Sequence, residues 1–161
     1  HTTMLDNIRN HWGGWIAAGE PTFWETWQLN PITSMCHAWS ATPTHDLTAY
    51  VLGITPDDTM PQSVRIAPNP AGLTWAEGVA PMPNGDVALA WRWQPNRFEL
   101  SVDLPSHMQA TFVLPAVVTE KASEFLLNGT ALQTNTIRLG AGNHQFVAIL
   151  PSSSTTYRQV N

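Results

Sequence analysis

Residues 87–102, VALAWRWQPNRFELSV, decide the fold of this chain. Large apolar side chains recur at every second position in Val87–Trp93 and again in Phe98–Val102, which is the period of a half-buried β-strand. Because Trp91 and Trp93 are two residues apart, they share one face of their strand. We expect that face to lie in a sandwich core, with a sugar-stacking platform as the alternative. The Gln-Pro-Asn turn between the runs predicts an antiparallel hairpin.

Short runs of the same period continue through residues 57–161. They lie at Ser63–Ala67, Leu73–Pro81, Gln109–Leu114, Glu124–Leu127, Thr136–Leu139 and Phe146–Leu150. Turn sequences separate them, and Asn128-Gly129 predicts a tight hairpin turn. Eight short strands at this spacing predict an antiparallel β-sandwich.

Residues 1–56 have helical spacing instead. Apolar residues recur at three- and four-residue steps from Thr3 to Ala18, and Thr42 is the expected N-cap of a second helix with Pro43 in its first turn. Two helices cannot bury the tryptophans between them. We therefore expect a domain boundary at residues 56 and 57, and further helices upstream of His1 that cover these side chains. Cover by the sandwich is the alternative.

Composition excludes several classes of partner. Charged residues make up 12% of the chain, about half the usual share of roughly 25%, and the net charge is −5 with no cluster of Lys or Arg. A phosphate backbone and an anionic membrane both need such a cluster, so we expect neither nucleic acid nor a membrane as partner. Cys36 is expected to be a small buried side chain, and it predicts no disulfide and no metal site. The compartment, cytoplasmic or exported, stays open.

The pentapeptide Phe23-Trp-Glu-Thr-Trp27 places a single carboxylate, Glu25, among aromatic rings. Aromatic faces pack against the C–H surfaces of sugars, and a partly shielded carboxylate can act as a general base. A structural glutamate at the edge of a tryptophan-rich core is the alternative. His37 lies among small and aromatic residues, where it is either a structural side chain or a hydrogen-bonding partner for a ligand hydroxyl.

Several ordered motifs resemble bacterial α-L-rhamnosidases, glycoside hydrolase family seventy-eight. Those similar to the end of the catalytic domain are Thr22-Phe-Trp-Glu-Thr-Trp27, Ser34-Met-Cys-His-Ala-Trp-Ser40 and Leu52-Gly-Ile-Thr-Pro56. Those similar to the small C-terminal domain are Val64-Arg-Ile-Ala-Pro68, Leu73-Thr-Trp-Ala-Glu-Gly78 and Val87-Ala-Leu-Ala-Trp91. The resemblance covers nearly the whole chain, although the family motif often carries Arg at the position of Thr26.

The resemblance implies a fold and a mechanism. Residues 1–56 would be the last helices of an α/α toroid of six hairpins, and residues 57–161 the C-terminal β-sandwich domain. Hydrolysis of terminal α-L-rhamnose from a glycoside or oligosaccharide would proceed with inversion and without a cofactor. Glu25 would be the general base, His37 would hydrogen-bond the sugar, and Trp24, Trp27 and Trp39 would shape the pocket wall.

An inverting glycosidase also needs a general acid, roughly 6.5–9.5 Å from the base. The resemblance puts that acid upstream of His1, so we expect this chain alone to be inactive and its partner to be the upstream catalytic portion of the same enzyme. Asp6, Glu20 and Asp46 are poor substitutes by their positions on or beside helices. Two other hypotheses remain for the sandwich, a carbohydrate-binding module and a purely structural cap.

Overall fold

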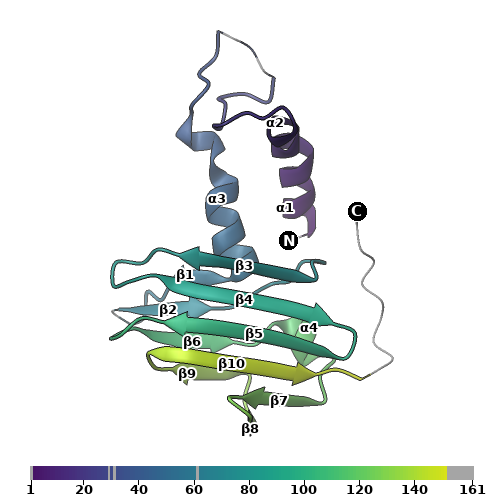
Figure 1. The fold of residues 1–161 in the computed structure, drawn as a ribbon, viewed down its shortest axis with the longest axis vertical. Coiled ribbons are helices and arrows are strands. Elements are labelled where there is room, and N and C mark those ends of the chain that lie inside the picture. Colours follow the sequence, from purple (N-terminus) through teal and green to yellow (C-terminus); the bar gives the residue numbers. More distant parts are fainter. Residues whose placement is uncertain (1, 29, 31, 61, 152–161) are drawn as a thin grey trace. The chain divides into compact units, whose positions relative to one another are not determined.

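The computed structural model describes residues 2–28, 30, 32–60 and 62–151. The chain divides into two compact units, His1–Leu47 and Thr48–Asn161. The structure is mostly antiparallel β-sheet with a few short helices, which confirms the predicted sandwich (Figure 1). The allocation of residues 1–56 to a helical toroid stays a prediction.

The first unit begins with one continuous helical segment, as predicted. It consists of α1 (Thr2–Asn7), the π-helical turn η1 (Ile8–Trp12) and α2 (Gly13–Ala17). Gly19, with φ of 74°, ends it, because its N–H donates to Ile16 O while Glu20 N–H donates to Trp15 O, both at 3.0 Å. This pair of bonds is a Schellman cap.

The next helical segments along the chain are short. They are the 3₁₀ turn η2 (Ala38–Ser40), α3 (Thr42–Asp46) and the π-helical segment η3 (Leu47–Leu52). The prediction of Thr42 as N-cap is wrong, because Ala41 holds that position, no side chain caps the helix, and Thr42 is already helical. Pro43 does lie in the first turn, where its missing N–H has no intrahelical acceptor to lose.

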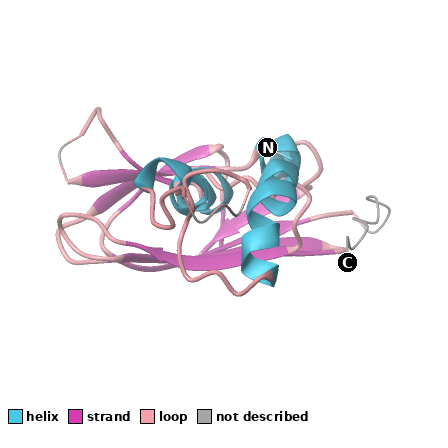
Figure 2. Cartoon of the chain, turned by 90° about the horizontal axis from the view of Figure 1, so that it is seen from above, coloured by secondary structure: helices cyan, strands magenta, loops and turns pink. Residues whose placement is uncertain are grey.

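The described part of the second unit contains ten strands in two sheets, coloured magenta in Figure 2. The first sheet has the order β1-β2-β6-β9, with β1 Ile54–Pro56, β2 Ser63–Ile66, β6 Gln109–Val113 and β9 Thr136–Leu139. The second has the order β3-β4-β5-β10-β7-β8. Its strands are β3 Trp75–Ala80, β4 Val87–Gln94, β5 Arg97–Leu104, β10 Gly142–Ile149, β7 Glu124–Leu127 and β8 Thr130–Ala131. A single helical turn, α4 (Ala116–Thr119), follows β6.

The sheet topology departs from the prediction in two respects. Strands β2 and β6 pair in parallel, whereas all other strand pairs of the described residues are antiparallel. Strands β1 and β8 were not expected, since three and two residues carry too little of a period-two pattern to recognise. The predicted Asn128-Gly129 turn is confirmed, because both residues have positive φ and join the pair Leu127↔Thr130.

The sandwich core follows the predicted alternation. On β4 and β5 the inward side chains are fully or nearly fully buried, at Val87, Leu89, Trp91, Phe98, Leu100, Val102 and Leu104. Phe112 of β6 meets Phe146 of β10 edge to face at 5.3 Å, which joins the two sheets. Trp91 is 1% exposed and donates from Nε1 to Val51 O at 3.2 Å, so it is a core residue and not a sugar platform.

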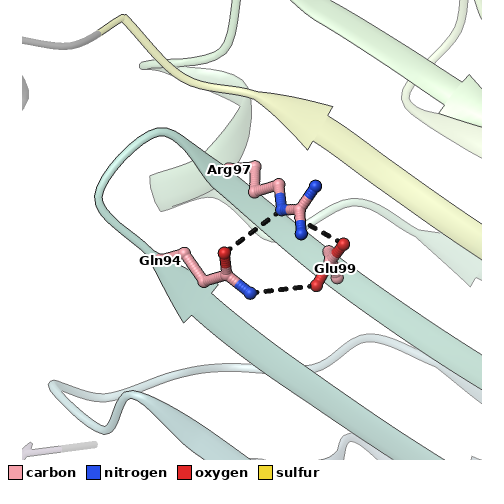
Figure 3. A network of polar contacts seen from close by, with 3 residues as sticks. All are labelled: Gln94, Arg97 and Glu99. Atoms are coloured by element: carbon pink, nitrogen blue, oxygen red, sulfur yellow. Dashed lines mark hydrogen bonds and ion pairs between the residues drawn. The ribbon is translucent and has the colours of Figure 1, made fainter.

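A polar ring secures the β4–β5 hairpin on the surface (Figure 3). Arg97 Nε donates to Gln94 Oε1 at 3.2 Å and lies 3.2 Å from Glu99 Oε1, while Gln94 Nε2 donates to Glu99 Oε2 at 3.1 Å. Each contact is solvent-exposed or half-buried, so its stabilising effect is small. The two-residue turn Pro95-Asn96 therefore depends mainly on its own conformation and on the core beneath it.

Asp57 organises the loop after β1. Its Oδ1 accepts from Thr59 N at 3.0 Å and from the Thr59 hydroxyl, and its Oδ2 accepts from Thr111 Oγ1 at 3.0 Å. The hydrogen bonds from Thr59 chiefly hold the pKa of this carboxyl below its ordinary value, with Thr111 and the nearby Arg138 adding to the effect. These bonds fasten the loop to β6.

We expect Asp57→Asn to reduce the melting temperature at pH 7 by a few degrees. A lowered folded-state pKa means that the carboxylate stabilises the fold above the unfolded pKa, and that this stabilisation is lost as the pH falls through the folded pKa. The difference between wild type and variant should therefore shrink below pH ~4. Thermal unfolding between pH 7 and pH 3 measures it, with Asp58→Asn as control. A difference that stays constant with pH would contradict the assignment.

Candidate functional site

A cleft lined largely by tryptophan lies within the first unit. It has a volume of ≈ 410 Å³ and is lined by Trp12, Trp15, Glu25, Thr26, Trp27, Trp39, Ser40 and Thr42, here called the tryptophan cleft. Residues of η1 and α2, of the Glu25 segment and of η2 and α3 contribute to it. Three parts of the sequence that are distant from each other thus share one concave surface.

Backbone pairing brings the two predicted motifs together. Glu25 N–H donates to Ser34 O at 2.9 Å, and His37 N–H donates to Phe23 O at 2.8 Å. The Glu25 carboxylate adds a third link, because its Oε2 accepts from Ser34 N at 3.0 Å. Glu25 is half-buried, and its Oε1 accepts no hydrogen bond from the described residues. One carboxylate oxygen is therefore anchored while the other remains available to a water or a ligand.

Aromatic rings hold the wall of the cleft in place. The Trp27 ring stacks on His11 at 4.7 Å, meets Trp12 edge to face at 4.3 Å and lies 5.5 Å from Trp15. Trp12 Nε1 donates to Ser40 O at 2.7 Å, which ties the first helical segment to η2. Trp27 is nevertheless 49% exposed and Trp39 68% exposed, so both present ring surface to the cleft.

The predicted site residues separate into two groups. Glu25, Trp27 and Trp39 line the tryptophan cleft. Trp24 does not line it: its ring is 6% exposed and its Nε1 donates to Glu20 Oε2 at 3.0 Å. The Trp24 ring is thus held against Glu20, whereas Glu25 lines the cleft.

His37 does not line the cleft. Its half-buried ring contacts the Trp39 ring edge to face at 5.3 Å, and its carbonyl oxygen accepts from Ser40 Oγ at 2.8 Å. The side chain is thus placed to position Trp39. Cys36 is exposed, which makes the prediction of a buried thiol wrong.

Two cleft residues, Trp12 and Trp15, were not predicted as site residues, although their three-residue spacing on one helix face was a usable signal. Trp15 is buried, and its Nε1–H has no hydrogen-bond acceptor among the described residues. An unsatisfied buried donor costs about 1–3 kcal/mol.

Glu25 is the one carboxylate among the residues that line the cleft. The other acids of this unit are engaged elsewhere: Asp6 pairs with Arg9 at 3.2 Å, Asp46 lies 3.2 Å from the His45 ring, and Glu20 binds Trp24. In the described part of the chain, no group of His, Cys, Asp and Glu is placed to hold a metal ion. None of its helices combines the length and apolarity needed to span a lipid bilayer.

Comparison with known proteins shows what the chain is similar to. Residues 53–125 match the family described as Bacterial alpha-L-rhamnosidase C-terminal domain. The chain is 28% identical over 145 residues to an alpha-L-rhamnosidase of Alteromonas sp. (strain LOR). That match covers 84% of this chain and 16% of the relative.

Two solved structures share the fold, both with a TM-score of 0.69. One is an alpha-L-rhamnosidase from Dictyoglumus thermophilum, 19% identical, with 85% of this chain and 17% of that chain covered. The other is a Streptomyces avermitilis alpha-L-rhamnosidase complexed with L-rhamnose, 24% identical, with 84% and 14% covered. These findings confirm the resemblance to bacterial α-L-rhamnosidases. The chain spans only about a sixth of the length of these relatives: the match covers 16%, 17% and 14% of their chains.

Proposed function

We propose that this chain is the C-terminal part of an inverting α-L-rhamnosidase and carries the general base, Glu25. The supporting observation is that Glu25 is the one carboxylate lining an aromatic cleft, with one oxygen anchored on Ser34 N and the other unoccupied by described residues. A base in that state can take a proton from an attacking water. The rings of Trp27 and Trp39 would pack against the C–H face of the rhamnose.

The proposed mechanism also requires a general acid, which does not line the cleft. Inversion requires a second carboxyl group, roughly 6.5–9.5 Å from the base, to protonate the leaving oxygen. Because Asp6, Glu20 and Asp46 are engaged outside the cleft, we place the general acid in an upstream catalytic portion of the same enzyme. That portion would also cover exposed apolar side chains of the first unit such as Ile16 and Ile32, 77% and 88% exposed.

Activity on a chromogenic α-L-rhamnoside tests the proposal. The 161-residue chain alone should be inert, whereas the complete enzyme should release the aglycone and produce β-L-rhamnose first, as ¹H NMR of the fresh product can show. Turnover by the chain alone would mean that a general acid lies within it. Release of α-L-rhamnose first would overturn inversion, and an inert complete enzyme would overturn the activity itself.

His37→Ala tests a role in substrate binding. Loss of a side chain that holds the sugar, directly or through Trp39, should raise KM by about two- to tenfold with little change in kcat, since a hydrogen bond or aromatic contact contributes about 0.5–1.5 kcal/mol. Steady-state kinetics of the complete enzyme measure both constants. His45→Ala is the matched control, because that ring is exposed beside Asp46. An unchanged KM would make His37 a purely structural residue.

A second candidate function concerns the sandwich alone. Trp75, on edge strand β3, is 54% exposed and could stack on a sugar ring, which would make the sandwich a carbohydrate-binding module. Trp91 offers no such surface because it is buried. A single exposed ring is weaker support than the tryptophan cleft, and a structural cap needs no sugar contact at all. Sugar binding that is lost in Trp75→Ala would favour the module.

A further inference from the structure

One line of polar side chains crosses the whole first sheet of the sandwich. The strand registers pair Thr55 with Arg65, Arg65 with Thr111, and Thr111 with Arg138, so the four residues form a continuous row across β1, β2, β6 and β9. We call these four residues the arginine row. Their neighbours along the strands, such as Ile66 and Phe112, are buried in the core, so the row occupies the outer face.

A cavity of ≈ 740 Å³ lies over this row. Its lining consists of the arginine row together with Pro56, Asp57, Asp58, Thr59, Thr136 and Ile137. No aromatic ring contributes to it, so a ligand there would be recognised by hydrogen bonds and charge. Strands lie about 4.8 Å apart, which puts the two arginines on strands separated by roughly 10 Å.

The two arginines differ in the contacts that they already make. Arg138 Nη1 contacts Met60 Sδ at 2.8 Å, and its charge acts on the nearby Asp57 carboxylate. The Arg65 guanidinium is exposed and makes no hydrogen bond or ion pair with the described residues. Arg65 is therefore the cation of the cavity that can bind an anionic partner. A carboxylate would pair with its guanidinium through two parallel hydrogen bonds.

Neutral hydrogen-bonding groups surround that cation. The Thr111 hydroxyl donates its proton to Asp57 Oδ2, which leaves its oxygen as an acceptor for a ligand hydroxyl. Thr55 and Thr136 add two further hydroxyls. Because Arg65 has no carboxylate partner among the described residues, the cavity suits a ligand with one carboxylate and several hydroxyls, and the carboxylates of Asp57 and Asp58 disfavour a polyanion such as a nucleic acid.

We propose that the arginine row and its cavity bind a carboxylate-bearing saccharide unit, a uronic acid, with the carboxylate on Arg65 and the hydroxyls on Thr111 and Asp57. The site lies on the sandwich and uses none of the residues of the tryptophan cleft. It would therefore exist whether or not Glu25 acts as a base.

Titration of the ¹⁵N-labelled 161-residue chain tests the proposal. D-glucuronate should produce saturable chemical-shift changes at amides of β2 and β6, with a Kd at least tenfold lower than that of D-glucose or acetate, because charge and hydroxyl contacts must act together. Equal binding of acetate would reduce the cavity to a general carboxylate site and overturn the saccharide. Equal binding of glucose would overturn the role of Arg65, and no shift at these amides would overturn the site.

Two variants and one control refine the test. Arg65→Gln should weaken glucuronate binding by roughly tenfold or more, whereas Arg97→Gln, an arginine already bound to Gln94 and Glu99, should leave the Kd unchanged. Thr111→Val should weaken glucuronate severalfold without affecting acetate. Arg65 is exposed on the outer face, so the Gln variant is expected to fold, and its own ¹⁵N spectrum checks this. Wild-type affinity in Arg65→Gln would overturn the proposal.

Discussion

Glu25→Gln is expected to lower kcat of the complete enzyme by about 10²–10⁴-fold, the contribution that a general base typically makes. The amide cannot take a proton from the attacking water. Its oxygen can still accept the hydrogen bond from Ser34 N that anchors Glu25 at 3.0 Å, so the local fold should persist. Initial rates on a chromogenic α-L-rhamnoside measure the loss of kcat. Thermal unfolding of wild type and variant checks that the stability is unchanged.

Glu20→Gln is the matched control, because Glu20 is a carboxylate of the same unit that binds Trp24 Nε1 and does not line the cleft. Its kcat should stay within a few-fold of wild type. Added azide should partly restore turnover in Glu25→Gln, since an anionic nucleophile does not need deprotonation, and the product should be the inverted glycosyl azide. Near-normal turnover of Glu25→Gln without azide would remove Glu25 from the mechanism.

The sandwich could be predicted because its signal is local. Strand β4 alternates Val87, Leu89 and Trp91 with solvent-facing positions, and burial against the first sheet requires only that alternation. The parallel pairing of β2 with β6 could not be predicted, because it joins Ser63 to Gln109 across more than forty residues and depends on packing in three dimensions.

The candidate site was predictable in its motifs but not in its orientation. The sequence marks Glu25 and His37 as separate candidates. Only the backbone pairing of Phe23 with His37, and of Glu25 with Ser34, places their segments side by side. Trp24, next to Glu25 in the sequence, instead donates to Glu20 and does not line the cleft. A pentapeptide does not state which of its side chains face the same side until its backbone conformation is known.

Strand β1 was missed for a similar reason. The apolar run that ends at Ile54 looks helical up to its last residue, but Gly53 adopts φ of 78° and redirects the chain so that Ile54 pairs with Ile66. A glycine signals that a helix can end at that position. It does not signal that a strand begins at the next residue.

Gly53→Ala is therefore expected to destabilise the second unit strongly, by at least about 3 kcal/mol. A Cβ at this position would lie 2.3 Å from both Ala67 C and Ala67 O, and 2.4 Å from Pro68 N, all of them backbone atoms that cannot rotate away. The positive φ adds strain of its own. For a unit of this size the melting temperature should fall by roughly 10–20 °C, which thermal unfolding followed by circular dichroism can measure.

Alanine substitutions at two other glycines should cause smaller losses of stability than Gly53→Ala. A Cβ at Gly78 would meet Leu52 Cδ1 at 2.7 Å, the end of a flexible side chain, so Gly78→Ala should cost less than Gly53→Ala. A Cβ at Gly140 would meet nothing within 4 Å, and Gly140→Ala should change stability by no more than about 1 kcal/mol. If Gly53→Ala is insoluble, the soluble Gly78 and Gly140 variants still test the order. Equal losses at all three positions would show that backbone contact at Gly53 does not decide where β1 begins.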